Sequence, residues 1–472
     1  MNGDHGTFPI TTGAVSSTVS VTGVGFMPDA VILFWNSRTG TSNAVGRANG
    51  VFGVGVGVSS SERWCVGTWD EDAADPTNSE RFTRADACVF HGSTGVDGLA
   101  DFVSMDSDGF TLIIDDQFNS SHEIHYLALG GDDVTDVAAG NFQSADDPSI
   151  GSTQDFTSLS FQPDFVLVAN RSSSTVTGDA SNGVMALGWA VGTGTGDQYG
   201  GCWGTDDNVS GDTDTGSNLS DSQCIKISST GSPGAPSGRA QITSFLSNGF
   251  ELTWTEPNPA VTIFYLAMKG GGYATGSIAS RTDTTEQTES GVGFQPTGLF
   301  FLTQAMTGFT GADSRHFDCM MSIGAASSIT SRSCIVTWDE DNETSGSVHS
   351  TGSLFDEMMG CIDWSDDASW RAYMDVTEFN SDGFKYIMDD EHPSETADIA
   401  YIAFGASTTP GEITETASVD VQIAGEVTNA GSVRLQGPGE ITSAASVNIS
   451  IPNAPLFLRQ SLTGGMQRLW EI

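Results

Sequence analysis

The sequence predicts an all-β protein that consists of three tandem β-sandwich or jelly-roll-like domains followed by a short repetitive β-stem. Two internal repeats support this fold class: a unit of about 135 residues occurs three times, and a unit of 14 residues occurs three times after Pro410. The apolar runs are short, rich in Val, Ile, Phe and Tyr, and broken by Gly, Ser, Asp and Thr. No long stretch keeps a helical period, so strands are expected throughout.

Each large repeat begins with a proline turn before an apolar run. Pro28, Pro163 and Pro296 lie 135 and 133 residues apart and precede the runs AVILFW, FVLVAN and GLFFLT. Proline fixes φ and lacks an N–H, so it suits the position just before a strand.

Two further landmarks follow in the same order in every repeat. A hairpin turn reads Asp108-Gly109-Phe110, Asn248-Gly249-Phe250 and Asp382-Gly383-Phe384. A closing strand begins at Tyr126, Tyr265 and Tyr401. A segment of this length can bury its own core. The sequence therefore predicts autonomous sandwiches at 1–132, 133–272 and 273–407.

The segment 408–452 contains the three 14-residue copies, which begin at Gly411, Gly425 and Gly439. Each copy alternates apolar and polar residues, and so short a unit needs neighbours to bury its apolar face. We expect a β-stem wound with other copies of the chain, with a trimer favoured. The alternative is a meander packed on the third sandwich.

The last segment, 453–472, is predicted to be an apolar docking tail. Its candidate contact residues are Leu456, Phe457, Leu458, Leu469 and Trp470. The tail either inserts into a partner protein or folds back on the stem.

The charge is strongly acidic, with 60 Asp and Glu against 17 Lys and Arg and a formal net charge of −43. Self-repulsion of this size destabilises a compact state unless salt screens it, which indicates a halophilic host. No basic patch could neutralise phosphates, and no apolar run could span a bilayer, so neither nucleic acid nor membrane insertion is expected. The N-terminal sequence MNGDHGTFPITTG does not resemble a signal peptide. We therefore expect synthesis in the host cytoplasm.

Six of the seven cysteines recur in pairs at apparently equivalent places. The pairs are Cys65 with Cys88, Cys202 with Cys224, and Cys334 with Cys361. Each pair forms either one disulfide or two buried core thiols, and a reducing cytoplasm favours the thiols.

No cofactor is expected, although acidic loops offer a weak calcium signal. Asp70 and Asp72 in the first repeat, and Asp339 and Asp341 in the third, alternate along loops as oxygen ligands for Ca²⁺ would. Solvated loops are the simpler interpretation. No catalytic residues are predicted. The carboxylate pair at Asp115-Asp116 could suggest a glycosidase, but adjacent strand residues point to opposite faces.

The order GFxPD, SDGF and YLALGG resembles a repeat module in virion proteins of tailed bacteriophages and tailed haloarchaeal viruses. The resemblance covers about 1–406 and is weakest in the second repeat, where Ser160 replaces the turn glycine. It implies a non-enzymatic virion surface protein, either a head decoration or turret or a host-attachment protein. The implied partners are other virion proteins, bound through the C-terminal stem and tail, and host glycan or surface layer. A tail fibre is the alternative, and a tailspike glycan depolymerase is the enzymatic rival.

The halophilic interpretation predicts that low salt unfolds the protein. The melting temperature is expected to fall when salt is lowered from about 2 M to about 0.1 M, because the Debye length grows from a few ångströms to about 10 Å. Differential scanning calorimetry across this range measures the effect. An unchanged melting temperature would show that the charge does not act through repulsion.

Overall fold

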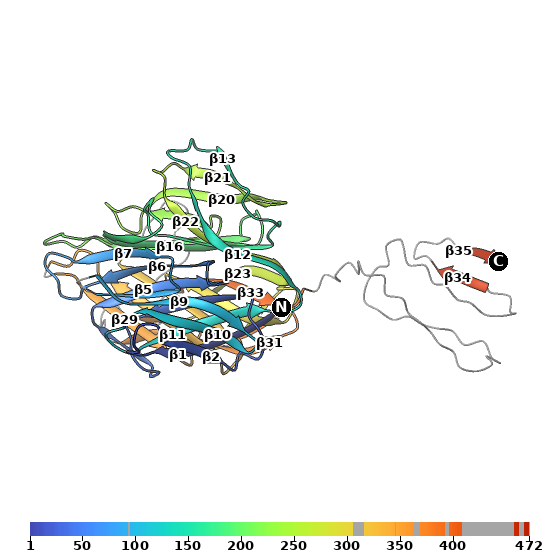
Figure 1. Cartoon of the computed structure of the whole chain (residues 1–472), viewed down its shortest axis with the longest axis horizontal. Helices are drawn as coiled ribbons and strands as arrows, with labels where there is room; N and C mark the ends of the chain where they lie inside the picture. The colour runs from blue at the N-terminus through green and yellow to red at the C-terminus, as the bar shows by residue number, and fades with distance from the viewer. Residues whose placement is uncertain are drawn as a thin grey trace. The chain divides into compact units, whose positions relative to one another are not determined.

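The computed structural model describes residues 1–92, 95–304, 316–344, 346–362, 369–391 and 396–407, together with the backbone of 457–461 and 467–471. The chain divides into two compact units, Met1–Thr408 and Thr409–Ile472. The described residues form antiparallel sheets and no helix, which confirms the all-β prediction (Figure 1).

Each large repeat folds into a large sheet packed on a four-stranded small sheet. In the first repeat, the large sheet contains β1 (Asn2–Ile10), β11 (His122–Gly130), β3 (Ala30–Asn36), β5 (Gly50–Gly57), β6 (Arg63–Asp70) and β7 (Ser79–Arg84). The small sheet contains β2 (Thr18–Thr22), β10 (Gly109–Asp116), β9 (Gly95–Asp106) and β8 (Cys88–Gly92).

The other two repeats have the same strand order. The second has β12 (Val134–Gln143), β22 (Thr262–Gly270), β14 (Phe165–Asn170), β16 (Gly183–Ala190), β17 (Gln198–Thr205) and β18 (Thr215–Ser220), and small-sheet strands β13 (Thr153–Phe156), β21 (Gly249–Glu256), β20 (Pro236–Leu246) and β19 (Ile225–Ser228). The third has β23 (Gly272–Ala279), β33 (Asp398–Gly405), β25 (Pro296–Thr303), β27 (Cys319–Ala326), β28 (Arg332–Asp339) and β29 (His349–Leu354), and small-sheet strands β24 (Gln287–Ser290), β32 (Gly383–Asp390), β31 (Trp370–Asn380) and β30 (Met359–Ile362).

The predicted turns lie where the sequence placed them. Each Asp-Gly or Asn-Gly turn joins two small-sheet strands, and Gly109, Gly249 and Gly383 have φ between 147° and 151°. The Asp108 carboxylate also accepts the Gly25 N–H at 2.7 Å, which ties the hairpin to the proline turn. The prolines precede or begin β3, β14 and β25, as expected for a residue without an N–H.

A seventh strand completes each large sheet, and it always comes from another repeat. From the second repeat, β15 (Gly178–Ser181) pairs with β7 of the first. From the third repeat, β26 (His316–Phe317) pairs with β18 of the second. From the first repeat, β4 (Ala44–Arg47) pairs with β29 of the third. The three exchanges close a ring with pseudo-threefold symmetry.

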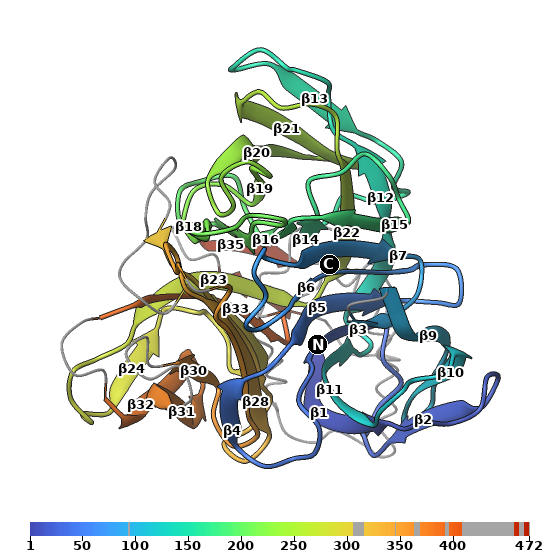
Figure 2. The same ribbon diagram turned by 90° about the vertical axis from the view of Figure 1, so that its left-hand side faces the viewer.

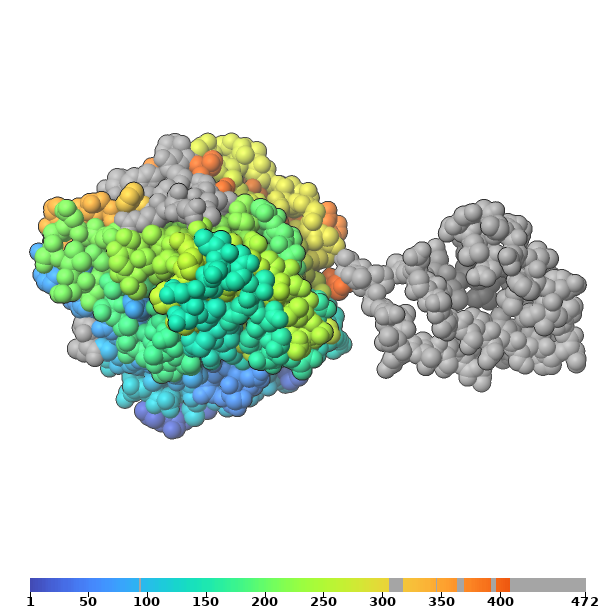
Figure 3. Space-filling view, turned by 90° about the horizontal axis from the view of Figure 1, so that it is seen from above, coloured from blue at the N-terminus to red at the C-terminus, as the bar shows by residue number. Residues whose placement is uncertain are grey.

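The large sheets are buried on both faces. In β3, Ile32 and Phe34 enter a central core shared by all three repeats, whereas Leu33 and Trp35 enter the core of their own sandwich. Phe300 of the third repeat meets Phe34 of the first at 6.0 Å and Trp189 of the second at 6.1 Å between ring centroids. Figure 2 shows the three sandwiches grouped around this centre, and Figure 3 shows the second repeat, teal to lime, lying against the other two.

The three sandwiches therefore do not form the autonomous domains that the sequence suggested. Residues 1–408 form one compact unit because the central core and the exchanged strands belong to all three repeats. A repeat taken alone would lack one strand of its large sheet and expose the inner face of that sheet to water.

The two ends of this body meet at one pole. The Met1 amino group forms an ion pair with Asp133, and the Ser407 N–H lies 3.4 Å from an oxygen of the same carboxylate. The strand register places the C-terminal ends of β6, β17 and β28 at the other end of the body, away from Met1 and Ser407. We call these the terminal pole and the distal pole.

The second compact unit is described only in part. Its described backbone is a hairpin in which β34 (Phe457–Ser461) pairs with β35 (Gln467–Glu471), so that Leu458 opposes Trp470. The predicted stem at 411–452 and Leu456 lie outside the described residues.

The shared core predicts that the three repeats unfold together. Phe300→Ala is expected to lower the free energy of unfolding by about 3–5 kcal/mol, the usual cost of removing a buried phenyl ring. Calorimetry should show one transition, shifted as a whole. The control is Ile150→Ala, which removes a side chain that is 73% exposed and should leave the transition in place. Separate transitions for the repeats would contradict a common core.

Candidate functional site

The distal pole brings together residues from equivalent positions of the three repeats. The last residues of β6, β17 and β28 are Asp70, Thr205 and Asp339. Asp339 is paired with His349 of the neighbouring strand β29. One donor atom each from Asp70, Asp339 and His349 lies within 4.8 Å of the other two. Residues at the same place in three symmetric repeats can approach each other only near the pseudo-threefold axis. We call Asp70, Thr205, Asp339 and His349 the axial cluster.

The axial cluster is sealed from solvent, with each residue at most 4% exposed. His349 Nδ1 lies 2.7 Å from Asp339 Oδ1. Within the described part of the chain, Asp70 Oδ1 and His349 Nε2 have no hydrogen-bond partner. Buried polar atoms without partners are uncommon in native proteins, so this cluster is a candidate binding site.

Electrostatics in the cluster follow from burial and from the paired carboxylates. Burial, and then the nearby Asp339 carboxylate, raise the pKa of Asp70 well above its usual range. Burial alone would lower the pKa of His349, but Asp339, and to a lesser extent Asp70 and Asp72, raise it to about 9. The neighbouring charges therefore outweigh desolvation at the imidazole.

Two glycines leave the space that the cluster occupies. A Cβ added at Gly50 would lie 2.6 Å from His349 Nε2, and one added at Gly183 would lie 2.8 Å from Asp70 Oδ1. The equivalent position in the third repeat is Cys319, paired across the strands with Asp339. Side chains at the two glycine positions would push the imidazole and the carboxylate out of place.

The four predicted calcium ligands separate into two groups. Asp70 and Asp339 join the axial cluster, whereas Asp72 Oδ1 accepts the His349 N–H at 3.2 Å and Asp341 Oδ1 accepts the Thr215 N–H at 2.9 Å. In the second repeat, Asp207 Oδ1 likewise accepts the Ser79 N–H at 3.1 Å. These loop carboxylates therefore tie each repeat to a neighbouring repeat through backbone N–H groups. Asp70 and Asp72 have different partners, as do Asp339 and Asp341.

A second group of carboxylates occurs in the first and third repeats. Asp86, Asp101 and Asp115 cluster in the first, and Glu357, Asp375 and Asp389 cluster in the third. Arg63 pairs with Asp101 at 2.8 Å, and Arg332 pairs with Asp375. Asp115 therefore meets carboxylates from other segments of its repeat, and both Asp115 and its neighbour Asp116 are exposed.

The second repeat replaces this charged group with neutral side chains. Gln223, Gln241 and Thr255 stand at the carboxylate positions by strand register, and Gln198 stands at the arginine position. Gln223 Nε2 donates to Thr255 Oγ1 at 2.9 Å. Because all four positions change together, the charged residues act as one unit in which an arginine supplies the positive charge.

All seven cysteines are buried free thiols, so no disulfide joins the predicted pairs. Burial raises the pKa values of the Cys88, Cys202 and Cys224 thiols. Their equivalence is also weaker than the sequence suggested. Cys65 and Cys334 occupy matching positions opposite Gly55 and Gly324, but the matching residue in the second repeat is Gly200, two positions before Cys202.

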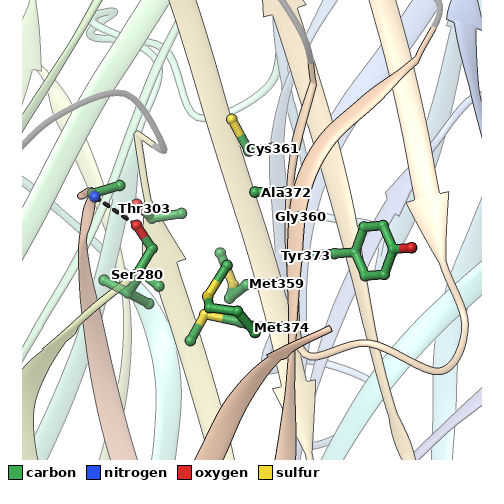
Figure 4. Close-up of a pocket in the computed structure, with 11 residues that line it drawn as sticks. Ser280, Thr303, Met359, Gly360, Cys361, Ala372, Tyr373 and Met374 are labelled. Carbon is green, nitrogen blue, oxygen red and sulfur yellow. Dashed lines mark hydrogen bonds between the residues drawn. The ribbon is translucent and has the colours of Figure 1, made fainter. Parts of the chain in front are cut away.

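A small cavity lies inside the third sandwich. Met359, Met374 and Cys361 line it together with Ser280, whose Oγ accepts the Ala397 N–H at 2.7 Å (Figure 4). Its volume of about 20 Å³ is close to that of a single water site, far below the size of a ligand pocket.

Comparison with known proteins identifies no relative: no family model matches the chain, and no curated protein is significantly similar to it. Among the described residues, no helix is long and apolar enough to cross a membrane.

The structure brings together residues that the sequence did not connect. His349 and Cys319 were not singled out, because their partners lie in other strands or other repeats. The only local signal was the acidity of the loops that follow β6 and β28. Those loops drew attention to Asp70 and Asp339 without indicating that the two residues meet.

The carboxylate group in the third repeat predicts a pH-dependent stability. Burial and the adjacent Asp375 raise the pKa of Glu357 from 4.5 to about 9. The folded state therefore binds this proton more tightly than the unfolded state, and stability should fall as pH rises between these values, by at most about 1.4 kcal/mol per pH unit. Glu357→Gln should flatten urea-unfolding free energies measured from pH 6 to 9.

Asp116→Asn is the matched control, because it removes an exposed carboxylate and should keep the wild-type slope. If the Glu357→Gln variant shows the same slope as the wild type, Glu357 does not hold a proton in the folded protein.

Proposed function

We propose that the chain is a non-enzymatic virion structural protein of a tailed virus with a halophilic host. In this role, the three-repeat body projects from the particle surface as a head decoration or turret. The observation that carries the proposal is the closed, strand-exchanged body with both of its ends at the terminal pole.

Such a body is suited to surface display. Its sheets are joined in a ring by backbone hydrogen bonds, and its core is continuous across the repeats. Force applied to one repeat is therefore shared by the other two. The described body ends at Ser407 beside Asp133, so its connection to 408–472 starts at the terminal pole. The distal pole lies at the other end of the body from Ser407.

The C-terminal segment is the proposed anchor. In this arrangement, 408–472 binds other virion proteins and further copies of the chain, with a trimer favoured, while the acidic body stays soluble in concentrated salt. Several copies on one particle would turn weak contacts with host glycan or surface layer into firm attachment.

Immunogold labelling of purified virions with an antibody against the first sandwich tests this role. Gold over the head is the expected result. Gold at the tail would replace the decoration role with that of a tail fibre or receptor-binding protein. Particles that lack the protein, by labelling and by mass spectrometry, would contradict a virion role.

A further inference from the structure

The axial cluster contains acceptor atoms that the protein itself does not satisfy. Asp70 Oδ1 has no hydrogen-bond partner in the described part of the chain, although its residue is only 4% exposed. A second carboxylate, Asp339, lies beside it and contacts His349. Two buried carboxylates this close repel each other unless a proton or a cation lies between them, and a bound metal ion is one way to supply that positive charge.

We propose that Asp70, Asp339 and His349 form a structural site for one divalent transition-metal ion of the Zn²⁺ type. One imidazole nitrogen and two carboxylate oxygens are a ligand set typical of this class. Ca²⁺, which the acidic loops suggested, prefers ligands that are all oxygen, so the histidine argues against it.

The distances suit this assignment. Bonds of about 2.1 Å place two ligands of one ion at most about 4.2 Å apart. His349 Nδ1 and Asp339 Oδ1 are 2.7 Å apart, which is a hydrogen-bond distance. Two tetrahedral ligands with bonds of about 2.1 Å lie about 3.4 Å apart, so an ion that replaces this proton would move the two side chains slightly apart. The donor of Asp70 lies within 4.8 Å of both, so the carboxylate is close enough to belong to the same site.

The surroundings also favour a closed, structural site. Thr205 lies within hydrogen-bonding reach of the Asp70 carboxyl group and offers a neutral oxygen beside this ligand. Gly50 and Gly183 leave room for the ligand side chains, because a Cβ at either position would press on His349 or Asp70. Asp70 belongs to the first repeat, Asp339 and His349 belong to the third, and Thr205 belongs to the second. The ion would therefore fasten all three repeats together at the distal pole.

The test uses the full chain in concentrated salt. The protein is unfolded, treated with a chelator and refolded with Zn²⁺ or without metal, and excess Mg²⁺ then removes ions held loosely by surface carboxylates. The expected result is one Zn²⁺ per chain by elemental analysis and a higher melting temperature than that of the metal-free protein. A wild-type protein that retains no stoichiometric Zn²⁺ and melts at the same temperature would overturn the proposal.

Two variants locate the ion. Asp70→Asn has the shape of a protonated aspartic acid and should fold, but it should bind Zn²⁺ at least roughly tenfold more weakly, the smallest effect expected when a ligand is lost. The matched control, Asp207→Asn, changes a carboxylate in the equivalent loop of the second repeat that accepts the Ser79 backbone N–H, and it should keep one Zn²⁺. Equal Zn²⁺ content in wild type and Asp70→Asn would place the ion elsewhere and overturn the assignment.

Co²⁺ provides a readout that does not depend on any variant. Wild-type protein refolded with Co²⁺ should show visible d–d absorption of an ion with nitrogen and oxygen ligands in a low-symmetry site. A spectrum identical to that of aqueous Co²⁺ would contradict coordination by His349.

Discussion

Burial of the large sheets on both faces is the constraint on which the rest of the structure depends. In β3, alternate side chains enter two different cores: Leu33 and Trp35 pack against the small sheet, whereas Ile32 and Phe34 pack against the other repeats. A single repeat can cover only the first of these faces. The second face requires two further large sheets, and the exchanged strands hold those sheets in register. The need to cover this face explains why three copies of the unit pack together.

The same constraint creates the axial cluster. Because the large sheets meet around a pseudo-threefold axis, the ends of β6, β17 and β28 converge at the distal pole. The three copies lie on one chain, so their residues can differ: the positions hold Asp70, Thr205 and Asp339. A trimer of identical chains would have to place the same residue three times. Fusion of the repeats therefore permits an asymmetric site with two carboxylates, one hydroxyl and one imidazole.

Divergence between the repeats is also visible away from the axis. The first and third repeats keep an arginine among three carboxylates, whereas the second repeat has only neutral residues at those positions. The backbone is the same in all three cases, since Gly55, Gly188 and Gly324 approach a carbonyl oxygen of the small-sheet segment at equivalent points. The shared core thus keeps the fold constant while the polar sites vary.

The sequence alone determined the β class, the repeat boundaries and the turns, because these depend on residues close together in the chain. Pro28 and the Asp108-Gly109 turn act on their own neighbours, so their effects can be predicted locally. The runs AVILFW, FVLVAN and GLFFLT carried a further signal, since strands without polar alternation are typical of sheets buried on both faces.

Only the tertiary structure decided how the repeats join and which side chains meet. The exchanged strands β4, β15 and β26 are two to four residues long and lack an apolar pattern, so their partners cannot be identified from local sequence. Asp70 meets Asp339 and His349 because the three large sheets converge at the axis. That convergence depends on packing between repeats that are far apart in the chain, and no local pattern encodes it.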